Sequence, residues 1–271
     1  MKGCRYLVAS ALALAALSAC SDQDTQRLTL TGSSTVAPLV NEIARRYEAT
    51  HPQVRIDVQT GGSTRGVRDA RAGLADIGMA SRALRADESD LVGTPIARDG
   101  ITIIVHADNP VQGLEREEIR AIYGGEIDDW SAVGGKAGPI TVIHKADGRS
   151  TQELFLQHFG LGSADVKADI IIGDNKQGLR TLVSDPSAIG YVSIGAAEFA
   201  HERGEAVRLL ALEGVPASTD NVRTGRFPLA RPLTLVTNAP PEGLAADFID
   251  YARSAQVHDL VRKLYFVPLD G

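Results

Sequence analysis

Apolar and polar residues follow two alternating patterns along the chain from residue 28 onward. Residues 54–59 alternate strictly between apolar and polar side chains, as in a strand with one face in water. Residues 36–47 place apolar side chains at helical spacing, and residues 101–105 form an apolar run typical of a central strand. The same patterns predict further strands at 28–30, 77–80, 140–143, 188–193, 207–212 and 233–236, and helices at 67–74, 114–123, 151–159, 244–254 and 257–265. This alternation predicts an α/β fold of mostly parallel sheets flanked by helices.

Two segments have the composition of connections between lobes. Residues 106–110 follow the central strand with the sequence His-Ala-Asp-Asn-Pro, and residues 225–232 are rich in Gly, Pro and Arg. A chain that leaves one lobe near residue 106 and returns near residue 232 forms a discontinuous first lobe, 28–105 plus 233–271. The second lobe, 106–232, is then continuous.

The N-terminus has the pattern of a secretion signal. Lys2 and Arg5 precede a small and apolar run, residues 6–19, which is shorter than the roughly twenty residues of a membrane span. The run ends in Leu-Ser-Ala-Cys20 and turns polar at once, which resembles a bacterial lipobox. Removal of the signal peptide would then leave a lipidated Cys20 and a polar tether, residues 20–27. Ordinary signal cleavage, with Cys20 incidental, is the alternative.

The amino-acid composition excludes several classes of function. The chain of 271 residues is 44% hydrophobic and 23% charged, as expected of a folded soluble protein, and its net charge of -6 offers no basic field for nucleic acid. Both cysteines lie within the first twenty residues, so the folded body has no disulfide. The six histidines lack metal-ligand spacing and no G-x-S-x-G elbow is present, so we predict no metal, no cofactor and no enzyme. A serine hydrolase or a phosphatase is the enzyme alternative.

A tetrapeptide, G-x-S-T, occurs three times, each time between a predicted strand and a predicted helix. The copies begin at Gly32, Gly61 and Gly148. A helix N-terminus offers unpaired N–H groups and a partial positive charge, and glycine lets a ligand approach the backbone. Together with serine and threonine hydroxyls, these loops predict a site for a small oxyanion. Helix capping is the simpler alternative, and Ser150-x-x-Glu153 fits a capping box.

Basic residues lie beside these loops. Arg65 follows the second copy, Lys145 and Arg149 flank the third, and Arg82 ends the strand at 77–80. A guanidinium can hold an oxyanion by two parallel hydrogen bonds, whereas lysine acts as a point charge. We therefore expect Arg149 to contribute more binding free energy than Lys145. Further arginines are interpreted as solvated surface charges: Arg68, Arg71 and Arg85.

In its ordered motifs the chain resembles the periplasmic phosphate-binding proteins of Pst-type ABC transporters, in their shorter form. The stretches that carry the resemblance are residues 31–39, 61–66, 75–82, 145–151, 188–192 and 227–232. The resemblance covers the chain from about residue 28 to the C-terminus. It implies a two-lobed type II periplasmic-binding fold, with two crossover strands at the hinge and inorganic phosphate in the cleft. It further implies a monomer that delivers phosphate to permease subunits and catalyses nothing.

The resemblance also implies which residues bind phosphate. The residues carried over are Ser34, Thr35, Ser63, Ser81, Arg82, Lys145, Arg149, Ser150 and Thr151, with Asp147 orienting a cation. The family usually has arginine at Lys145, so Arg149 is the candidate replacement. Some members have an aspartate after Ser81 that accepts the proton of phosphate, where this chain has Arg82. Selectivity for phosphate over sulfate or molybdate is therefore left open by the sequence.

The sequence also bears on the cellular location and the biological role of the protein, each with an alternative. The periplasm follows from the signal peptide, and in a bacterium with two membranes Ser21, rather than aspartate, after Cys20 favours the outer membrane. A lipoprotein that senses phosphate or serves adhesion is the alternative to transport.

Overall fold

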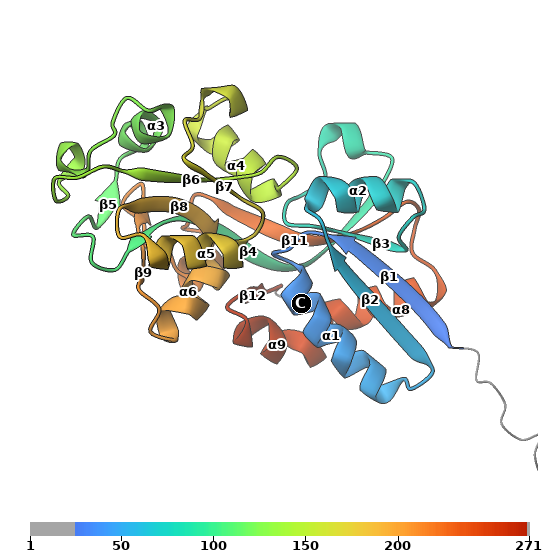
Figure 1. The fold of residues 1–271 in the computed structure, drawn as a ribbon. Helices are drawn as coiled ribbons and strands as arrows, with labels where there is room; N and C mark the ends of the chain where they lie inside the picture. The colour runs from blue at the N-terminus through green and yellow to red at the C-terminus, as the bar shows by residue number, and fades with distance from the viewer. Residues whose placement is uncertain (1–24, 270–271) are drawn as a thin grey trace, which may run out of the picture.

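Two α/β lobes lie side by side and share a long strand that runs through both, β4 (Val92–His106) (Figure 1). The computed structural model describes residues 25–269. The predicted signal peptide and lipidated Cys20 lie outside the described residues. The predicted tether is shorter than expected, because Gln26 and Arg27 already belong to the first strand.

The first lobe is built on a mixed sheet in the strand order β2-β1-β3-β11-β4. Its strands are β1 (Gln26–Gly32), β2 (Val54–Thr60), β3 (Ile77–Ala80), β11 (Ala230–Thr237) and the first part of β4 (Val92–His106). The strands β1, β2 and β3 are parallel, and β11 runs antiparallel to both β3 and β4. Its helices are α1 (Ala37–Thr50), α2 (Ser63–Arg71), α8 (Gly243–Arg253) and α9 (His258–Lys263).

The second lobe continues the sheet in the order β4-β8-β6-β7. Its strands are β6 (Thr141–Lys145), β7 (Ile170–Ile172), β8 (Ala188–Ser193) and β9 (Val207–Leu209). Its helices are α3 (Arg116–Gly124), α4 (Ser150–Phe159), α5 (Asn175–Ser184), α6 (Ile194–Glu202) and α7 (Thr219–Arg223). A small separate sheet pairs β5 (Gly113–Leu114) with β10 (Ala211–Leu212), and β12 (Val267–Pro268) pairs with β4.

Strand β4 is the physical link between the lobes. Residues 92–100 pair with β11 in the first lobe, and residues 101–106 pair with β8 and β9 in the second. The chain therefore changes lobes inside this strand, a few residues before the predicted crossing at residue 106. The charged pair Arg98 and Asp99 interrupts the apolar pattern, so only the second half of the strand was predicted from the sequence.

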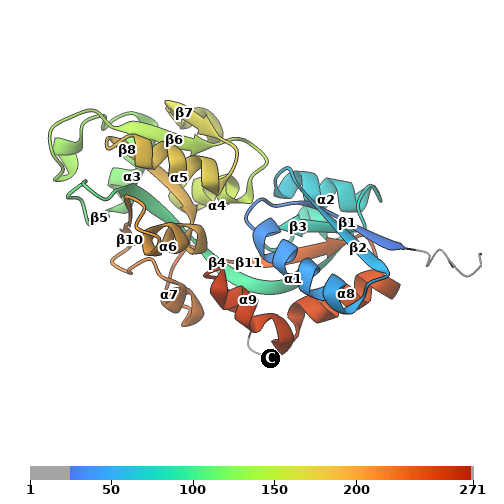
Figure 2. The ribbon, with the colours of Figure 1, turned by 60° about the horizontal axis from the view of Figure 1, so that its bottom comes forward.

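Each lobe has its own apolar core, and a second view of the ribbon shows the two lobes beside each other (Figure 2). In the first lobe Leu30 and Ile43 are fully buried together with Phe248. In the second, the rings of Phe155 and Tyr191 stack with centroids 3.9 Å apart. Separate cores allow the lobes to move as rigid bodies about the shared strands.

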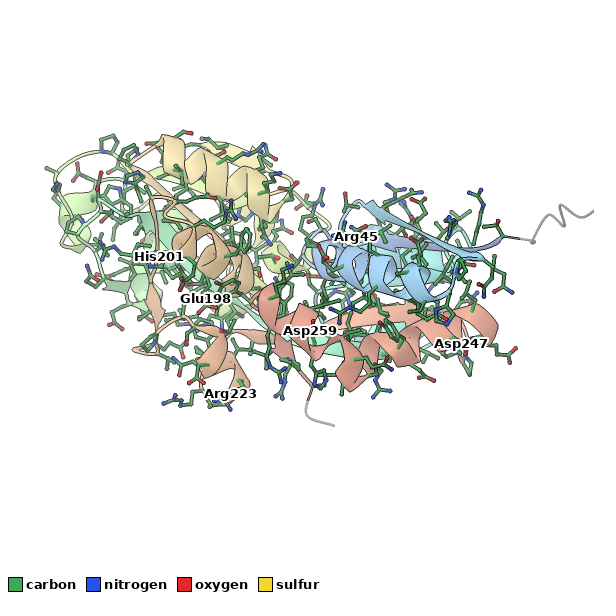
Figure 3. The ribbon with its side chains drawn as sticks, turned by 90° about the horizontal axis from the view of Figure 1, so that it is seen from below. Arg45, Glu198, His201, Arg223, Asp247 and Asp259 are labelled. Carbon is green, nitrogen blue, oxygen red and sulfur yellow. The ribbon has the colours of Figure 1, made fainter. Side chains whose placement is uncertain are left out.

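A view of the side chains from below shows residues of both lobes (Figure 3). Arg45, Asp247 and Asp259 lie on the first lobe, and Glu198, His201 and Arg223 lie on the second. Across residues 25–269 no helix is both long and apolar enough to span a membrane.

Three helices of the second lobe, α5, α6 and α7, were not predicted. In α5 the glycine at position 178 breaks the helical pattern, and glycine costs about 1 kcal/mol relative to alanine inside a helix. The structure explains why it is there: a Cβ at Gly178 would lie 2.6 Å from the side chain of Ile172, so glycine lets α5 pack closely on the sheet.

Candidate anion-binding site

All three G-x-S-T loops join a strand to a helix, as predicted. They connect β1 to α1, β2 to α2 and β6 to α4. The first begins at Gly32, which has a φ of 131° and lies so close to β3 that a Cβ would sit 2.3 Å from the carbonyl oxygen of Met79. Only glycine fits this junction.

Hydroxyl groups of the first lobe tie its loops together. Ser33 Oγ accepts hydrogen bonds from the backbone N–H groups of Thr35 and Val36, in the turn that leads into α1, whereas the N-cap residue Val36 makes no side-chain cap. Ser63 Oγ accepts from the backbone N–H of Ser81, 3.2 Å away, and so joins the start of α2 to the end of β3. The first two loops and Ser81 therefore form one continuous wall of the cleft.

The third loop differs from the capping box predicted for Ser150 and Glu153. The residue at the N-cap of α4 is Arg149, which makes no side-chain cap. Ser150 is the first residue of the helix, and its Oγ is buried without a hydrogen-bond partner among the described residues. Glu153 does not turn back to the helix start but bonds to groups of the first lobe. An unpartnered buried hydroxyl at a helix N-terminus is a vacant donor for an anion.

Lys145, the last residue of β6, places an ammonium group beside this loop. It is 3% exposed, and no carboxylate of the described residues forms an ion pair with it. Its pKa is lowered to about 7, mainly by burial and then by the positive charge of Arg231; the negative charge of Asp174 opposes the shift, and Arg149 adds to it. An anion bound here would supply the missing counter-charge.

Arg149 is the second cation of the loop. Its side chain is half-buried and packs against the second loop across the cleft, because a Cβ at Gly62 would lie 3.1 Å from Arg149 Cδ. No carboxylate forms an ion pair with Arg149 among residues 25–269. Its guanidinium is thus available to a ligand.

Arg231 is the cation that sequence reasoning missed. It lies on β11, is completely buried, and binds Asp99 through Nε and Nη2 at 3.2 and 2.9 Å. Its Nη1 donates to Ser81 Oγ in the first lobe and to Thr151 Oγ1 in the second, at 3.2 and 2.8 Å. The burial of its guanidinium lowers the pKa of Arg231, and Asp99 opposes that shift. The arginine lies in the motif at 227–232, so that stretch was the available signal.

Two predicted site residues have other partners. Arg82 binds Glu88 through both Nη atoms, at 2.6 and 2.8 Å, and its Nε donates to Glu153. Its charge is thus balanced by two carboxylates, so Arg82 does not offer an anion the unpaired charge that was predicted for it. Asp147 accepts hydrogen bonds from Gln152 and Ser163 and makes no ion pair with a cation among the described residues.

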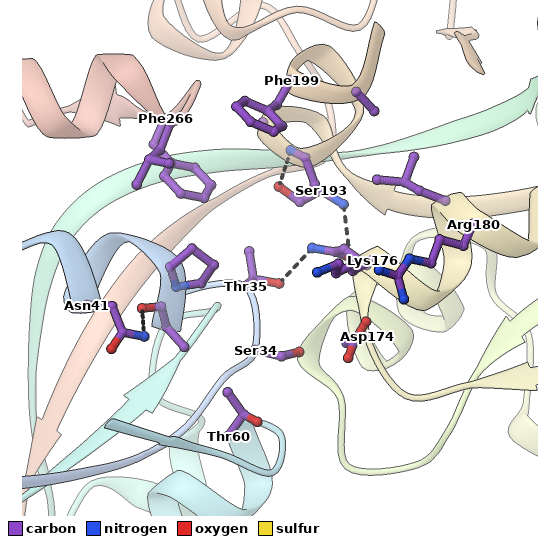
Figure 4. A pocket seen from close by; sticks show the side chains of 18 of the residues that line it. Ser34, Thr35, Asn41, Thr60, Asp174, Lys176, Arg180, Ser193, Phe199 and Phe266 are labelled. Atoms are coloured by element: carbon purple, nitrogen blue, oxygen red, sulfur yellow. Dashed lines mark hydrogen bonds between the residues drawn. The ribbon is translucent and has the colours of Figure 1, made fainter. Parts of the chain in front are cut away.

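The two lobes meet around these groups, so the structure is closed. On one rim, the backbone N–H of Thr64 donates to the carbonyl of Gly148 at 3.3 Å. On the other rim, Asn175 Nδ2 donates to Thr35 Oγ1 at 3.3 Å. The second rim opens into a groove of about 610 Å³ between α1, α5, α6 and the C-terminal segment, where Ser34 faces Asp174 (Figure 4).

The predicted site residues other than Arg82 lie at two places along the closed cleft. Ser81 of the first lobe is joined to Thr151 of the second through Arg231, and Gly62, next to Ser63, lies against Gly148 and Arg149. Ser34 and Thr35 lie instead on the other rim, near Asp174 and Asn175. Within the described part of the chain, no group of three histidine, cysteine, aspartate or glutamate residues could hold a metal ion. The arrangement can hold an anion by charge and hydrogen bonds.

The similarity of this chain to known proteins is consistent with an anion-binding site. A family model described as a PBP superfamily domain matches residues 19–256. The chain is 29% identical to the phosphate-binding protein PstS of Bacillus subtilis, over 89% of this chain and 80% of that one. It is 24% identical to the PstS protein of Borreliella burgdorferi, over 92% of each chain.

Solved structures share the fold over most of its length. A phosphate ABC transporter substrate-binding protein from Clostridium perfringens, with bound phosphate, superposes with a TM-score of 0.83 at 29% identity, covering 90% of this chain and all of that one. An ABC-type phosphate transport receptor from Vibrio cholerae gives 0.75 at 28% identity, over 89% of this chain and all of that one. These findings confirm the predicted two-lobed fold, and the chain belongs to the PBP superfamily.

Proposed function

We propose that this protein captures inorganic phosphate between its lobes and delivers it to an ABC transporter. The observation that carries the proposal is the closure of both lobes around cations that lack counter-charges. Lys145 and Arg149 have no carboxylate partner among the described residues, and Arg231 has one, Asp99. The cleft therefore holds an excess of positive charge at a helix N-terminus, which suits a dianion.

Each wall of the cleft contributes a different kind of donor. The second lobe offers Lys145, Arg149 and the first N–H groups of α4, with the free hydroxyl of Ser150. The first lobe offers hydroxyls: Ser34, Thr35, Ser63 and Ser81. Charge-assisted hydrogen bonds are worth about 1.5–3 kcal/mol each, so several of them account for micromolar binding, about 8 kcal/mol.

The relatives support transport over the other roles. Those named above are phosphate-binding proteins and substrate-binding proteins of phosphate ABC transporters. We further propose that the protein works outside the cytoplasm as a monomer, held to a membrane by lipid on Cys20, with Ser21 favouring the outer membrane. Replacing Cys20 with alanine should release the protein into the soluble periplasmic fraction. Unchanged fractionation would argue against the lipid anchor.

Calorimetry with phosphate, sulfate and molybdate tests the ligand. We expect saturable heat with phosphate and much weaker binding of the other two anions. Saturable heat with sulfate and none with phosphate would reassign the site to another oxyanion. A chromogenic phosphate ester, incubated with the same sample, should give no product, whereas turnover would favour a phosphatase.

A further inference from the structure

Glu153 crosses the cleft rather than serving its own helix. It lies in the first turn of α4 in the second lobe, yet within residues 25–269 its side-chain hydrogen bonds all reach the first lobe. Thr64 Oγ1 donates to Oε1 at 3.0 Å, Arg82 Nε donates to Oε2 at 3.1 Å, and Arg85 Nη1 reaches Oε2 at 3.4 Å. One carboxylate thus gathers three donors of the opposite lobe.

The receiving side of this contact is built into the first lobe. Both Nη atoms of Arg82 are held by Glu88, which is 1% exposed, and Arg85 binds the same carboxylate at 3.0 Å. The Nε of Arg82 is therefore fixed in place before the lobes meet, so little side-chain entropy is lost when it bonds to Glu153. When the lobes separate, Arg82 keeps its ion pair with Glu88, whereas Glu153 loses its ion pair with Arg82.

The contact is adjacent to the proposed phosphate site on both sides. Thr64 directly follows Ser63 at the start of α2, and Glu153 lies one turn after Ser150 on α4. The backbone of Thr64 also bonds to Gly148 at 3.3 Å. The same two helix ends therefore come together when phosphate binds and when Glu153 meets its partners, so that the two events are coupled.

We propose that Glu153 is a latch residue that holds the lobes closed and slows the release of phosphate. It acts by positioning the two lobes and not by touching the ligand, and the inference rests on the proposed function. Its side chain is 24% exposed, so the latch is partly screened by solvent and remains reversible. On the other rim, the bond between Asn175 and Thr35, at 3.3 Å, joins two neutral side chains.

Stopped-flow release of phosphate from the full chain tests the latch. In the variant Glu153→Gln we expect release to be about tenfold faster and affinity about tenfold weaker, because changes at an interface act mainly on dissociation. High salt should speed release from the wild type and have little effect on the variant. The control Glu202→Gln, an exposed carboxylate at the end of α6, should match the wild type.

Further measurements separate a latch from a structural role. The melting temperature of Glu153→Gln should stay near that of the control, because Arg82 keeps Glu88. Small-angle scattering of the ligand-free variant should give a larger radius of gyration than the wild type. Should Glu153→Gln not fold, Thr64→Val removes one donor from the same carboxylate and should speed release about two- to threefold.

Clear outcomes would overturn the proposal. A wild-type release rate in both Glu153→Gln and Thr64→Val rules out the latch. Absence of phosphate binding by the wild type would defeat the proposed function instead. In that case the scattering comparison decides alone, and equal radii for Glu153→Gln and Glu202→Gln would rule the latch out.

Discussion

The two walls of the cleft are made of different chemistry. The first lobe presents neutral hydroxyls, and the nearby arginine, Arg82, is balanced by Glu88 and Glu153. The second lobe presents Lys145 and Arg149 without carboxylate partners among the described residues. Arg231, on β11 next to the shared strand β4, bonds to both walls. One wall therefore supplies positive charge, and the other supplies hydroxyl groups that can hydrogen-bond to a ligand.

This difference suggests an order of events. A long-range charge attracts an anion before any hydrogen bond forms, so the second lobe should make the first contact. The hydroxyls of the first lobe gain their bonds only after the lobes close. Loss of a cation should then weaken the first contact, and loss of a hydroxyl should weaken closure.

The largest effect is expected at the hinge, where both walls depend on Arg231. Arg231→Met leaves Asp99 buried without its partner, which should destabilise the fold by about 3–5 kcal/mol and abolish phosphate binding. Urea unfolding and calorimetry measure the two effects. Arg231→Lys keeps the charge and should recover part of the stability. Full phosphate affinity in Arg231→Met would show that the hinge cation is not part of the site.

On the charged wall, Lys145→Met should have opposite effects on binding and on stability. Affinity for phosphate should fall by about 2–4 kcal/mol, because a desolvated charge contact is lost. The ligand-free protein should become more stable at pH 7, on the order of 2 kcal/mol, because an unpaired buried ammonium is removed. Calorimetry and thermal melts check both signs. A drop in ligand-free stability would contradict the burial cost assigned to Lys145.

The pH dependence of stability and of phosphate affinity reports on the same residue, Lys145. Its pKa in the folded protein is about 7, below the ordinary 10.5, so between these values the unfolded chain carries a proton that the folded chain lacks. The contribution of Lys145 to ligand-free stability therefore rises with pH across this window. Phosphate favours the charged form, so affinity should fall above pH 7, by up to about tenfold per pH unit.

The variant Lys145→Arg provides the control for the pH profile, since arginine stays charged throughout. The second ionisation of phosphate affects the wild type and the variant alike. The difference between their affinity profiles therefore reports the lysine. Parallel profiles across pH 7–9 would contradict the low pKa.

The smallest effects compare two arginines of different exposure. Arg149→Gln should cost about 1–2 kcal/mol of binding free energy, since the guanidinium is half-buried. This reverses the order predicted from the sequence, in which Arg149 exceeded Lys145, because Lys145 lies deeper. Arg68→Ala should cost about 0–1 kcal/mol, since its side chain is 72% exposed. Equal losses in calorimetry would mean that Arg149 is only a surface charge.

Most of the fold could be predicted from periodicity, and the failures have physical causes. Strand β8, at 188–193, has the predicted bounds because every residue in it is buried. The first half of β4 was missed because it holds Arg98 and Asp99, and Asp99 is satisfied by Arg231 from a strand far away in the sequence. Local patterns cannot reveal a pairing over that separation.

The loops of the site could be predicted from the sequence, but the hydrogen bonds that join their side chains could not. The three glycine-led loops lie at strand-to-helix junctions as expected. The bond between Arg82 and Glu153 was not predicted, because the two residues lie on opposite lobes and are 71 positions apart in the sequence. Arg231 was missed because nothing in its neighbourhood along the sequence shows that its strand passes behind Ser81 and Thr151.

A crystal structure of the phosphate complex tests the central claim most directly. Phosphate should lie between the lobes, with oxygens about 2.7–3.1 Å from Lys145 Nζ, Ser150 Oγ and the first N–H groups of α4. First-lobe hydroxyls should complete its coordination from the opposite wall. Phosphate found only in the groove between α5 and α6, with Ser150 Oγ and Lys145 Nζ still vacant, would contradict the account.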